Sequence, residues 1–141
     1  MDKIVIDTNV FVAALMSRRG ASFRLIELVG TGRFEIGVSV PLVLEYEDAA
    51  KRWVGSRIAL SEAAIDDVID YMCAVAEHHK VYFLWRPILK DSKDDMVLEL
   101  AVGAQCSFIV TYNVKDFEGI EAFGIGAITP KTFLEKIGAL P

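Results

Sequence analysis

The stretch Ile4-Val5-Ile6-Asp7-Thr8-Asn9-Val10, near the start of the chain, joins a strand-like run to a helix-like one. Its first three residues are apolar and β-branched, as expected of a central strand that is covered on both faces. An aspartate at the end of such a strand is costly to bury unless it is paired or metal-bound. The next two residues suit a helix entry, where backbone N–H groups orient a carboxylate. We therefore predict a functional acid at Asp7, with a simple helix cap as the alternative.

Similar runs recur along the chain and are separated by helical patterns. The predicted strands are 3–7, 35–39, 81–85, 107–111 and 125–128. The predicted helices are 10–16, 21–30, 41–53, 62–79, a stretch from 96, and a last helix that Thr129 caps. This alternation indicates βα units. We expect an α/β fold in three layers, with a mostly parallel sheet of about five strands between helices, formed by residues 1–141 as one domain.

Composition narrows the class of protein. Hydrophobic residues make up 53% of the 141 and charged residues 25%, which excludes a disordered chain. We expect no membrane span, because no apolar stretch approaches about 20 residues. The beginning of the chain carries no secretory segment, so we expect a cytoplasmic protein with Cys73 and Cys106 reduced. The net charge of −5 divides into +1 for residues 1–57 and −6 for the rest, which is compatible with a metallonuclease without supporting it.

Acidic residues recur where a predicted strand or loop gives way to a helix. They are Asp7, Glu45, the pair Asp94 and Asp95, and Asp116. The carboxyl ends of parallel strands share one edge, so these side chains can converge in one crevice. Carboxylates that meet without cations raise one another's pKa, and a divalent cation held by oxygen ligands removes that repulsion. The pattern predicts a small metal-dependent enzyme that acts on phosphodiesters.

Each acidic position also has a plainer interpretation. Glu45 lies about one turn into the helix 41–53, beside Glu47 and Asp48, and such charges often only solvate a helix face. We expect Asp95 to be a ligand and Asp94 a further contact, although acids at a helix start are favourable with the dipole alone. The last position is an oxygen-rich turn formed by Thr111, Asn113 and Asp116. Turns commonly carry such residues, so the order of the positions carries the argument.

This order resembles the PIN domain family of metal-dependent nucleases, and most of all its VapC-like branch of toxin components from prokaryotic toxin–antitoxin pairs. The resemblance covers essentially the whole chain. The matching segments are Asp7-Thr8-Asn9-Val10, Leu44-Glu45-Tyr46, Asp95 before its helix, Thr111 to Phe117, and Ile128-Thr129-Pro130-Lys131-Thr132-Phe133-Leu134. Asn113 stands where many members have Asp, which bears on a second metal position, and Ser92 stands where this branch often has Pro.

The resemblance implies an endoribonuclease that uses one or two Mg²⁺ or Mn²⁺ ions. The catalytic and metal-binding residues would be Asp7, Glu45, Asp95 and Asp116, supported by Thr8, Asn9, Asp94, Thr111 and Asn113. Single-stranded RNA is the expected substrate, because an open crevice cannot read bases inside an A-form duplex. The resemblance also implies a small antitoxin partner and a homodimer or higher oligomer. Two sets of apolar residues belong either to such an interface or to the core: Leu25, Ile26, Leu28 and Val29, and Ile65, Ile69 and Met72.

Two basic groups are candidates for RNA binding. They are Arg18 and Arg19 with Arg24, and Lys51 and Arg52 with Trp53 and Arg57. Both groups are able to contact phosphates, and Trp53 to stack on a base, although surface solubility explains such residues equally well. The histidines His78 and His79 lack spaced metal-binding partners, and we expect them to be structural.

Two alternatives to the nuclease remain open. One is a receiver-like module that binds Mg²⁺, which would require paired acids after the first strand; Asp7 has no such neighbour. The other is a PIN-like scaffold that binds partners without cleaving RNA.

Overall fold

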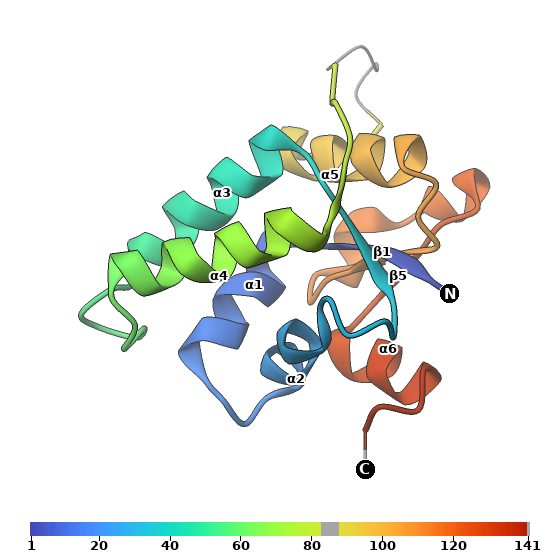
Figure 1. The fold of residues 1–141 in the computed structure, drawn as a ribbon. Helices are drawn as coiled ribbons and strands as arrows, with labels where there is room; N and C mark the ends of the chain where they lie inside the picture. Colours follow the sequence, from blue (N-terminus) through green and yellow to red (C-terminus); the bar gives the residue numbers. More distant parts are fainter. Residues whose placement is uncertain (83–87, 141) are drawn as a thin grey trace.

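The structure, a computed structural model, describes residues 1–82 and 88–140 and contains one five-stranded parallel sheet (Figure 1). Along the chain the elements are β1 (Lys3–Ile6), α1 (Thr8–Met16), α2 (Ala21–Leu28), β2 (Glu35–Val38), α3 (Val40–Lys51), α4 (Glu62–Val75), β3 (Glu77–His78), α5 (Ser92–Gly103), β4 (Phe108–Val110), the 3₁₀ turns η1 (Val114–Phe117) and η2 (Ile120–Phe123), β5 (Gly126–Ile128) and α6 (Pro130–Lys136). The expected three-layer α/β fold is confirmed.

The strand order β3-β2-β1-β4-β5 creates a switch point between β1 and β4. From β1 the chain moves outward to β2 and β3, and it then crosses back to β4 on the other side of β1. Crossovers between parallel strands are right-handed, so α1 to α4 cover one face of the sheet and α5 covers the other. Ligands of open α/β sheets bind beyond the carboxyl ends of the strands at such a point. The residues that follow β1 and β4 are therefore in the position where a ligand is expected to bind.

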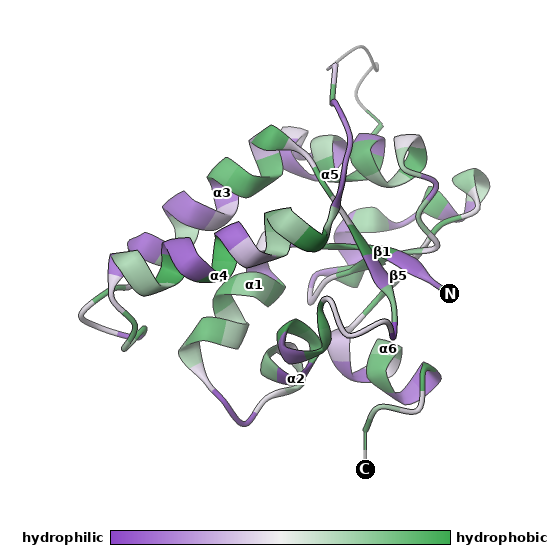
Figure 2. Cartoon of the chain, viewed as in Figure 1, coloured by the Kyte–Doolittle hydropathy of each residue, from purple (hydrophilic) through white to green (hydrophobic). Residues whose placement is uncertain are grey.

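The core explains how α3 is held against this edge. Tyr46 is buried, its ring stacks on Phe11 with centroids 4.6 Å apart, and its hydroxyl donates to the carbonyl of Ile6 at the end of β1. Helix α1 packs between α2 and α3. Figure 2 shows α1 as mostly hydrophobic, whereas α3 is hydrophobic in its first half and mostly hydrophilic in its second. The stacked rings and the hydroxyl fix the residue next to Tyr46, which is Glu45, near the end of β1.

One region departs from the expected elements. Helix α4 ends at Val75 rather than at residue 79, and β3 begins two residues later, where the sequence predicts helix. Of the predicted strand 81–85, residues 83–85 lie outside the described residues, and Val81 and Tyr82 are not in a strand. Both residues of β3 are exposed at the sheet edge, where an apolar pattern is not required. An ion pair between Lys3 and Glu77 and a bond from His79 N to Val38 O hold this edge strand instead.

The proposed interface residues turn out to belong mainly to the core. Leu25, Leu28, Val29, Ile65, Ile69 and Met72 are buried, and Ile26 is partly buried against them. Of the two interpretations, core and interface, the structure therefore favours the core, because the helices that carry these residues cover one another and the sheet.

Both cysteines are free, as expected, and Cys106 is buried. His78 Nε2 lies 2.7 Å from the carbonyl oxygen of Cys73, a local structural contact. No helix in the described part of the chain has the length and apolar character needed to span a bilayer.

Candidate functional site

Asp7 lies directly after β1 and is 8% exposed. It is the N-cap of α1: its Oδ1 accepts a hydrogen bond of 2.9 Å from Thr8 N. Its Oδ2 accepts a bond of 2.8 Å from Thr111 Oγ1, and Asn9 Nδ2 lies 3.4 Å away. Capping therefore occupies one carboxylate oxygen, while the other is held by side chains at the switch point.

The pKa of Asp7 is raised, chiefly because the carboxyl is buried. The hydrogen bonds from Thr111 and Thr8 lower that pKa in part, and the negative charges of Glu45 and Asp116 raise it further. Glu45 on α3 and Asp116 on η1 therefore lie near enough to act on Asp7, which directly follows β1. The fold brings these positions together as the acidic pattern predicts.

Thr111 connects the two strand ends that form the switch point. Its hydroxyl donates to Asp7 and accepts bonds from Asn9 Nδ2 at 3.3 Å and Asn113 N at 3.0 Å. Asn9 Oδ1 in turn accepts from Tyr112 N at 3.2 Å. Backbone bonds set the frame, because Asp7 N donates to the last residue of β4 and Thr111 N to the last residue of β5, both at 2.9 Å. This network gives the Asp7 carboxylate one defined orientation.

Asp94, in the first turn of α5, faces the same group of acids. Its pKa is raised from 3.8 to about 6, first by burial and then by the charges of Asp7, Asp91, Asp116 and Glu45. It also lines a hollow of about 650 Å³. The other charged residues of that hollow are Lys90, Asp91, Lys115, Asp116 and Glu118.

Asp95 has a different environment. Its Oδ1 accepts bonds from the backbone nitrogens of Ile88 at 3.1 Å and Leu89 at 2.9 Å, so it anchors the segment that enters α5. The sequence predicts Asp95 as the ligand and Asp94 as the support. In the structure it is instead Asp94 that lies near the other acids. Asp95 binds the backbone N–H groups of Ile88 and Leu89.

The donor chemistry of the site suits a hard divalent cation. Asp7, Glu45, Asp94 and Asp116 offer only oxygen ligands, and within the described ranges none of them forms an ion pair. Thr8 Oγ1 is the one buried side-chain oxygen or nitrogen, among residues 1–82 and 88–140, that has no hydrogen-bond partner. In the same residues no three His, Cys, Asp or Glu side chains are close enough to hold an ion as they stand. The carboxylates are therefore suitable ligands for a divalent cation. Their side chains would have to rotate to bring the oxygens around one ion.

The two predicted basic groups differ in how their charges are used. Lys51 Nζ pairs with Asp66 at 2.8 Å and Glu47 at 2.9 Å, which raises the pKa of Lys51, and Arg52 pairs with Asp48 at 2.5 Å. The guanidinium of Arg57 lies 5.7 Å from the centre of the Trp53 ring.

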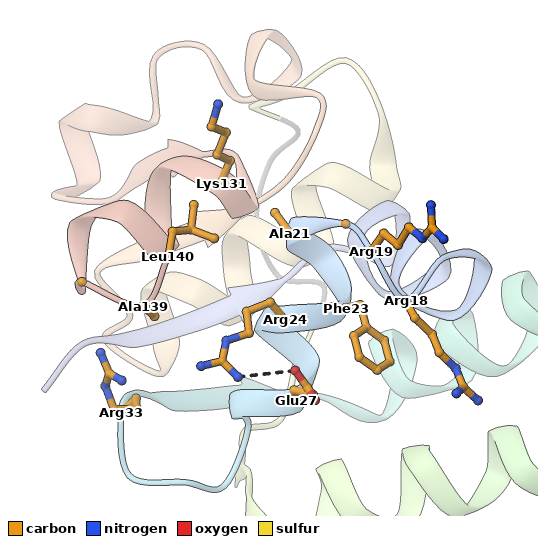
Figure 3. Close-up of a pocket in the computed structure, with 12 residues that line it drawn as sticks. Arg18, Arg19, Ala21, Phe23, Arg24, Glu27, Arg33, Lys131, Ala139 and Leu140 are labelled. Atoms are coloured by element: carbon orange, nitrogen blue, oxygen red, sulfur yellow. Dashed lines mark hydrogen bonds and ion pairs between the residues drawn. The ribbon is translucent and has the colours of Figure 1, made fainter.

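The other group lines a hollow of about 900 Å³ beside α2 and α6 (Figure 3). Its cations are Arg18, Arg19, Arg24, Arg33 and Lys131. Sequence reasoning did not place Arg33 and Lys131 in this group. No local signal could have done so, since they are separated by almost a hundred residues.

A parallel α/β domain with carboxylates gathered at its switch point has the features of a hydrolase. A model of the PIN domain matches residues 3–115. The chain therefore belongs to the PIN domain family, whose members are generally nucleases.

The fold is similar to that of a chain in the crystal structure of VapBC2 from Rickettsia felis bound to a DNA fragment from their promoter. The two chains are 14% identical with a TM-score of 0.58, over 89% of this chain and 96% of that one. A search of curated proteins found no match.

Proposed function

We propose that this protein is an endoribonuclease that hydrolyses phosphodiester bonds of single-stranded RNA with Mg²⁺ or Mn²⁺. The observation that carries the proposal is the nearness of Asp7, Glu45 and Asp116 to Asp94 beyond the carboxyl ends of the strands. Burial is the larger cause of the raised pKa of Asp94, and the negative charges of these acids raise it further. Within the described residues, Asp7, Glu45, Asp94 and Asp116 have no cationic partner. Such an arrangement is unfavourable in a resting protein, and it is typical of a site that binds a cation.

The ion-binding residues in this proposal are Asp7, Glu45, Asp94 and Asp116, with Asp95 as a positioning residue. When bound, a divalent ion would polarise the scissile phosphate and lower the pKa of an attached water. Thr111 and the N–H of Thr8 orient the carboxylate of Asp7 toward the site. Asn9 and Asn113 hold the Thr111 hydroxyl from either side, so that the donor to Asp7 does not rotate away.

The biological role that we propose is the toxin of a toxin–antitoxin pair, acting in the cytoplasm as one domain over residues 1–141. Support comes from the likeness in fold to a chain of the VapBC2 structure. A small antitoxin protein and assembly into a homodimer or higher oligomer are parts of the same proposal. The receiver-like alternative loses support, because receiver-like sheets have the order 2-1-3-4-5 and this sheet has β3 beside β2.

The test is cleavage of a labelled single-stranded RNA by the purified protein, with Mn²⁺ or with EDTA, beside Asp7→Asn. We expect metal-dependent cleavage that Asp7→Asn abolishes. The matched control is Asp48→Asn, which removes the same charge from an exposed pair on α3, and it should cleave like the natural protein. Melting temperatures of all three proteins separate chemistry from folding. Cleavage that survives in Asp7→Asn, or in EDTA, would contradict the proposed site. A folded protein that binds RNA but never cleaves it would favour the non-catalytic scaffold.

A further inference from the structure

The hollow beside α2 and α6 carries an excess of positive charge. Five cations line it against one acid, Glu27, which pairs with Arg24 at 3.4 Å. Both members of that pair are about half exposed, and such pairs contribute little, so Arg24 remains available to another anion. In Figure 3, Arg24 and Arg33 lie at one end of the hollow, Lys131 extends from α6 at the other end, and Arg18 points away from Arg24 and Arg33.

The charges of this hollow are largely uncommitted, in contrast to those near the end of α3. Within the part of the chain that the structure describes, Arg18, Arg19 and Lys131 form no ion pair through their side chains. Arg33 donates to the carbonyl oxygen of Ile137 at 2.8 Å, which positions it beside the end of α6 without neutralising it. Lys51 and Arg52 are already balanced by acids. In the second group Lys51 is held by two acids, Arg52 has one exposed partner, and Arg57 has no ion pair within the described residues. The hollow therefore has more cations without an acidic partner than the second group has.

A continuous set of contacts connects the hollow to the acidic site. Tyr112 follows Thr111, its backbone N–H bonds to Asn9, and its hydroxyl lies 2.5 Å from Ser22 Oγ in the first turn of α2. The neighbours of Ser22 on either side line the hollow. Lys131 lies in the first turn of α6, just after β5, whose last residue bonds to Thr111 N. The part of the hollow next to Ser22 and Lys131 therefore lies at the same edge of the sheet as Asp7.

Tyr112 lies between the two regions with its side chain well exposed. The residue is 48% accessible, and its hydroxyl is held by Ser22, so the ring is presented at a fixed place. An exposed aromatic ring beside a row of cations is the arrangement with which proteins bind single strands, because bases stack on the ring while phosphates contact the cations. An acidic peptide would use the cations but would have no need of the ring.

We infer that single-stranded RNA leaves the acidic site across Tyr112 and that its phosphates enter the hollow between α2 and α6, where Arg24, Arg33 and Lys131 bind them. This inference rests on the proposed ribonuclease function for the direction of the strand. Binding itself is measured without cleavage, so the two can fail separately. The hollow accounts for RNA binding by a protein whose net charge is −5. The positive charge is gathered on one surface, apart from the acids that would repel a phosphate in the absence of metal.

The experiment measures fluorescence anisotropy of a labelled oligouridylate of 12 nucleotides, titrated in EDTA at several salt concentrations. Arg24→Gln combined with Lys131→Gln should weaken binding about tenfold or more. The slope of log affinity against log salt should fall by roughly 0.7 for each lost phosphate contact. The matched control is Lys51→Gln combined with Arg52→Gln, which makes the same change in net charge and should stay within about twofold.

The stacking step has its own pair of variants. Tyr112→Leu should weaken binding about fivefold or more, because base stacking is lost, while Tyr112→Phe keeps the ring and should stay within about twofold. Melting temperatures confirm that each variant is folded.

Equal weakening by the two double variants would overturn the inference, since it would show a general charge effect. Strong binding of a polyglutamate peptide that depends on Arg24 and Lys131, with RNA binding unchanged, would assign the hollow to an acidic protein segment and also overturn it. Variant-dependent RNA binding together with cleavage that is insensitive to Asp7→Asn would leave this inference standing and remove the proposed catalytic site.

Discussion

Replacing Asp94 with Asn should make the metal-free protein more stable at neutral pH, although it removes a residue proposed to function in the site. The pKa of Asp94 is raised from 3.8 to about 6 by burial and by neighbouring carboxylates. The folded state therefore binds more protons than the unfolded state between about pH 4 and pH 6. In that interval the free energy of unfolding falls as pH rises.

The size of the effect follows from the same shift. A change of about two pKa units corresponds to at most about 3 kcal/mol. Solvent screens a partly exposed side chain, which reduces the expected gain to about 1 kcal/mol. For a domain of this size, that gain is a rise of about 3–4 °C in melting temperature. Asp94→Asn should therefore melt about that much above the natural protein at pH 7.5 in EDTA, and the difference should disappear toward pH 4.

The neighbouring residue supplies the control. Asp95→Ala removes the acceptor of the Ile88 and Leu89 N–H groups, so it should lower the free energy of unfolding by about 1–3 kcal/mol. Thermal melts from pH 4 to pH 8, with and without Mn²⁺, measure both variants. Added Mn²⁺ should stabilise the natural protein more than Asp94→Asn, because a ligand that binds the folded state stabilises it by an amount that increases with its affinity. An Asp94→Asn protein that is less stable than the natural one at pH 7.5 in EDTA would refute this account of the acids.

Three further changes test other parts of the structure. Thr111→Val removes the donor to Asp7 and should raise the pKa of that carboxyl, so the pH profile of cleavage should move to higher pH, while Thr111→Ser should restore it. Tyr46→Phe leaves the carbonyl at the end of β1 without its donor and should lower the free energy of unfolding by about 1–2 kcal/mol in urea denaturation. Gly30→Ala should lower the melting temperature by several degrees, because Gly30 has a φ of +81° and an added Cβ would collide with the hydroxyl of Tyr71; an unchanged melting temperature would show that the turn after α2 adapts.

The fold was predictable where burial leaves a pattern in the sequence. The strands β1 and β4 are apolar because helices cover both faces of the sheet. Their ends can therefore be located in the sequence, and with them the residues that follow, Asp7 and Thr111. The edge strand β3 has exposed residues on both faces, so it leaves no such pattern and was assigned to the preceding helix. Its position depends on contacts made far away in the chain, such as the ion pair with Lys3.

The site was predictable to the level of the segment, and less so to the level of the residue. Adjacent residues in a helix point about 100° apart. Whether Asp94 or Asp95 faces the sheet edge is therefore set by where α5 begins, at its cap Asp91, and by how the preceding segment approaches. Neither the start of α5 nor the path of the preceding segment can be predicted from a run of acidic residues. The basic hollow was partly missed for a related reason, since Arg33 and Lys131 line the same hollow only because α2 packs against α6.

The order of strands in the sheet has a consequence for synthesis of the protein. The hydroxyl donor to Asp7 is translated 104 residues after it and directly follows β4, the strand between β1 and β5. A growing chain on the ribosome therefore holds an unsupported carboxylate until residues 108–116 have emerged and paired. The acidic centre therefore assembles only after more than a hundred residues that follow Asp7 have been synthesised.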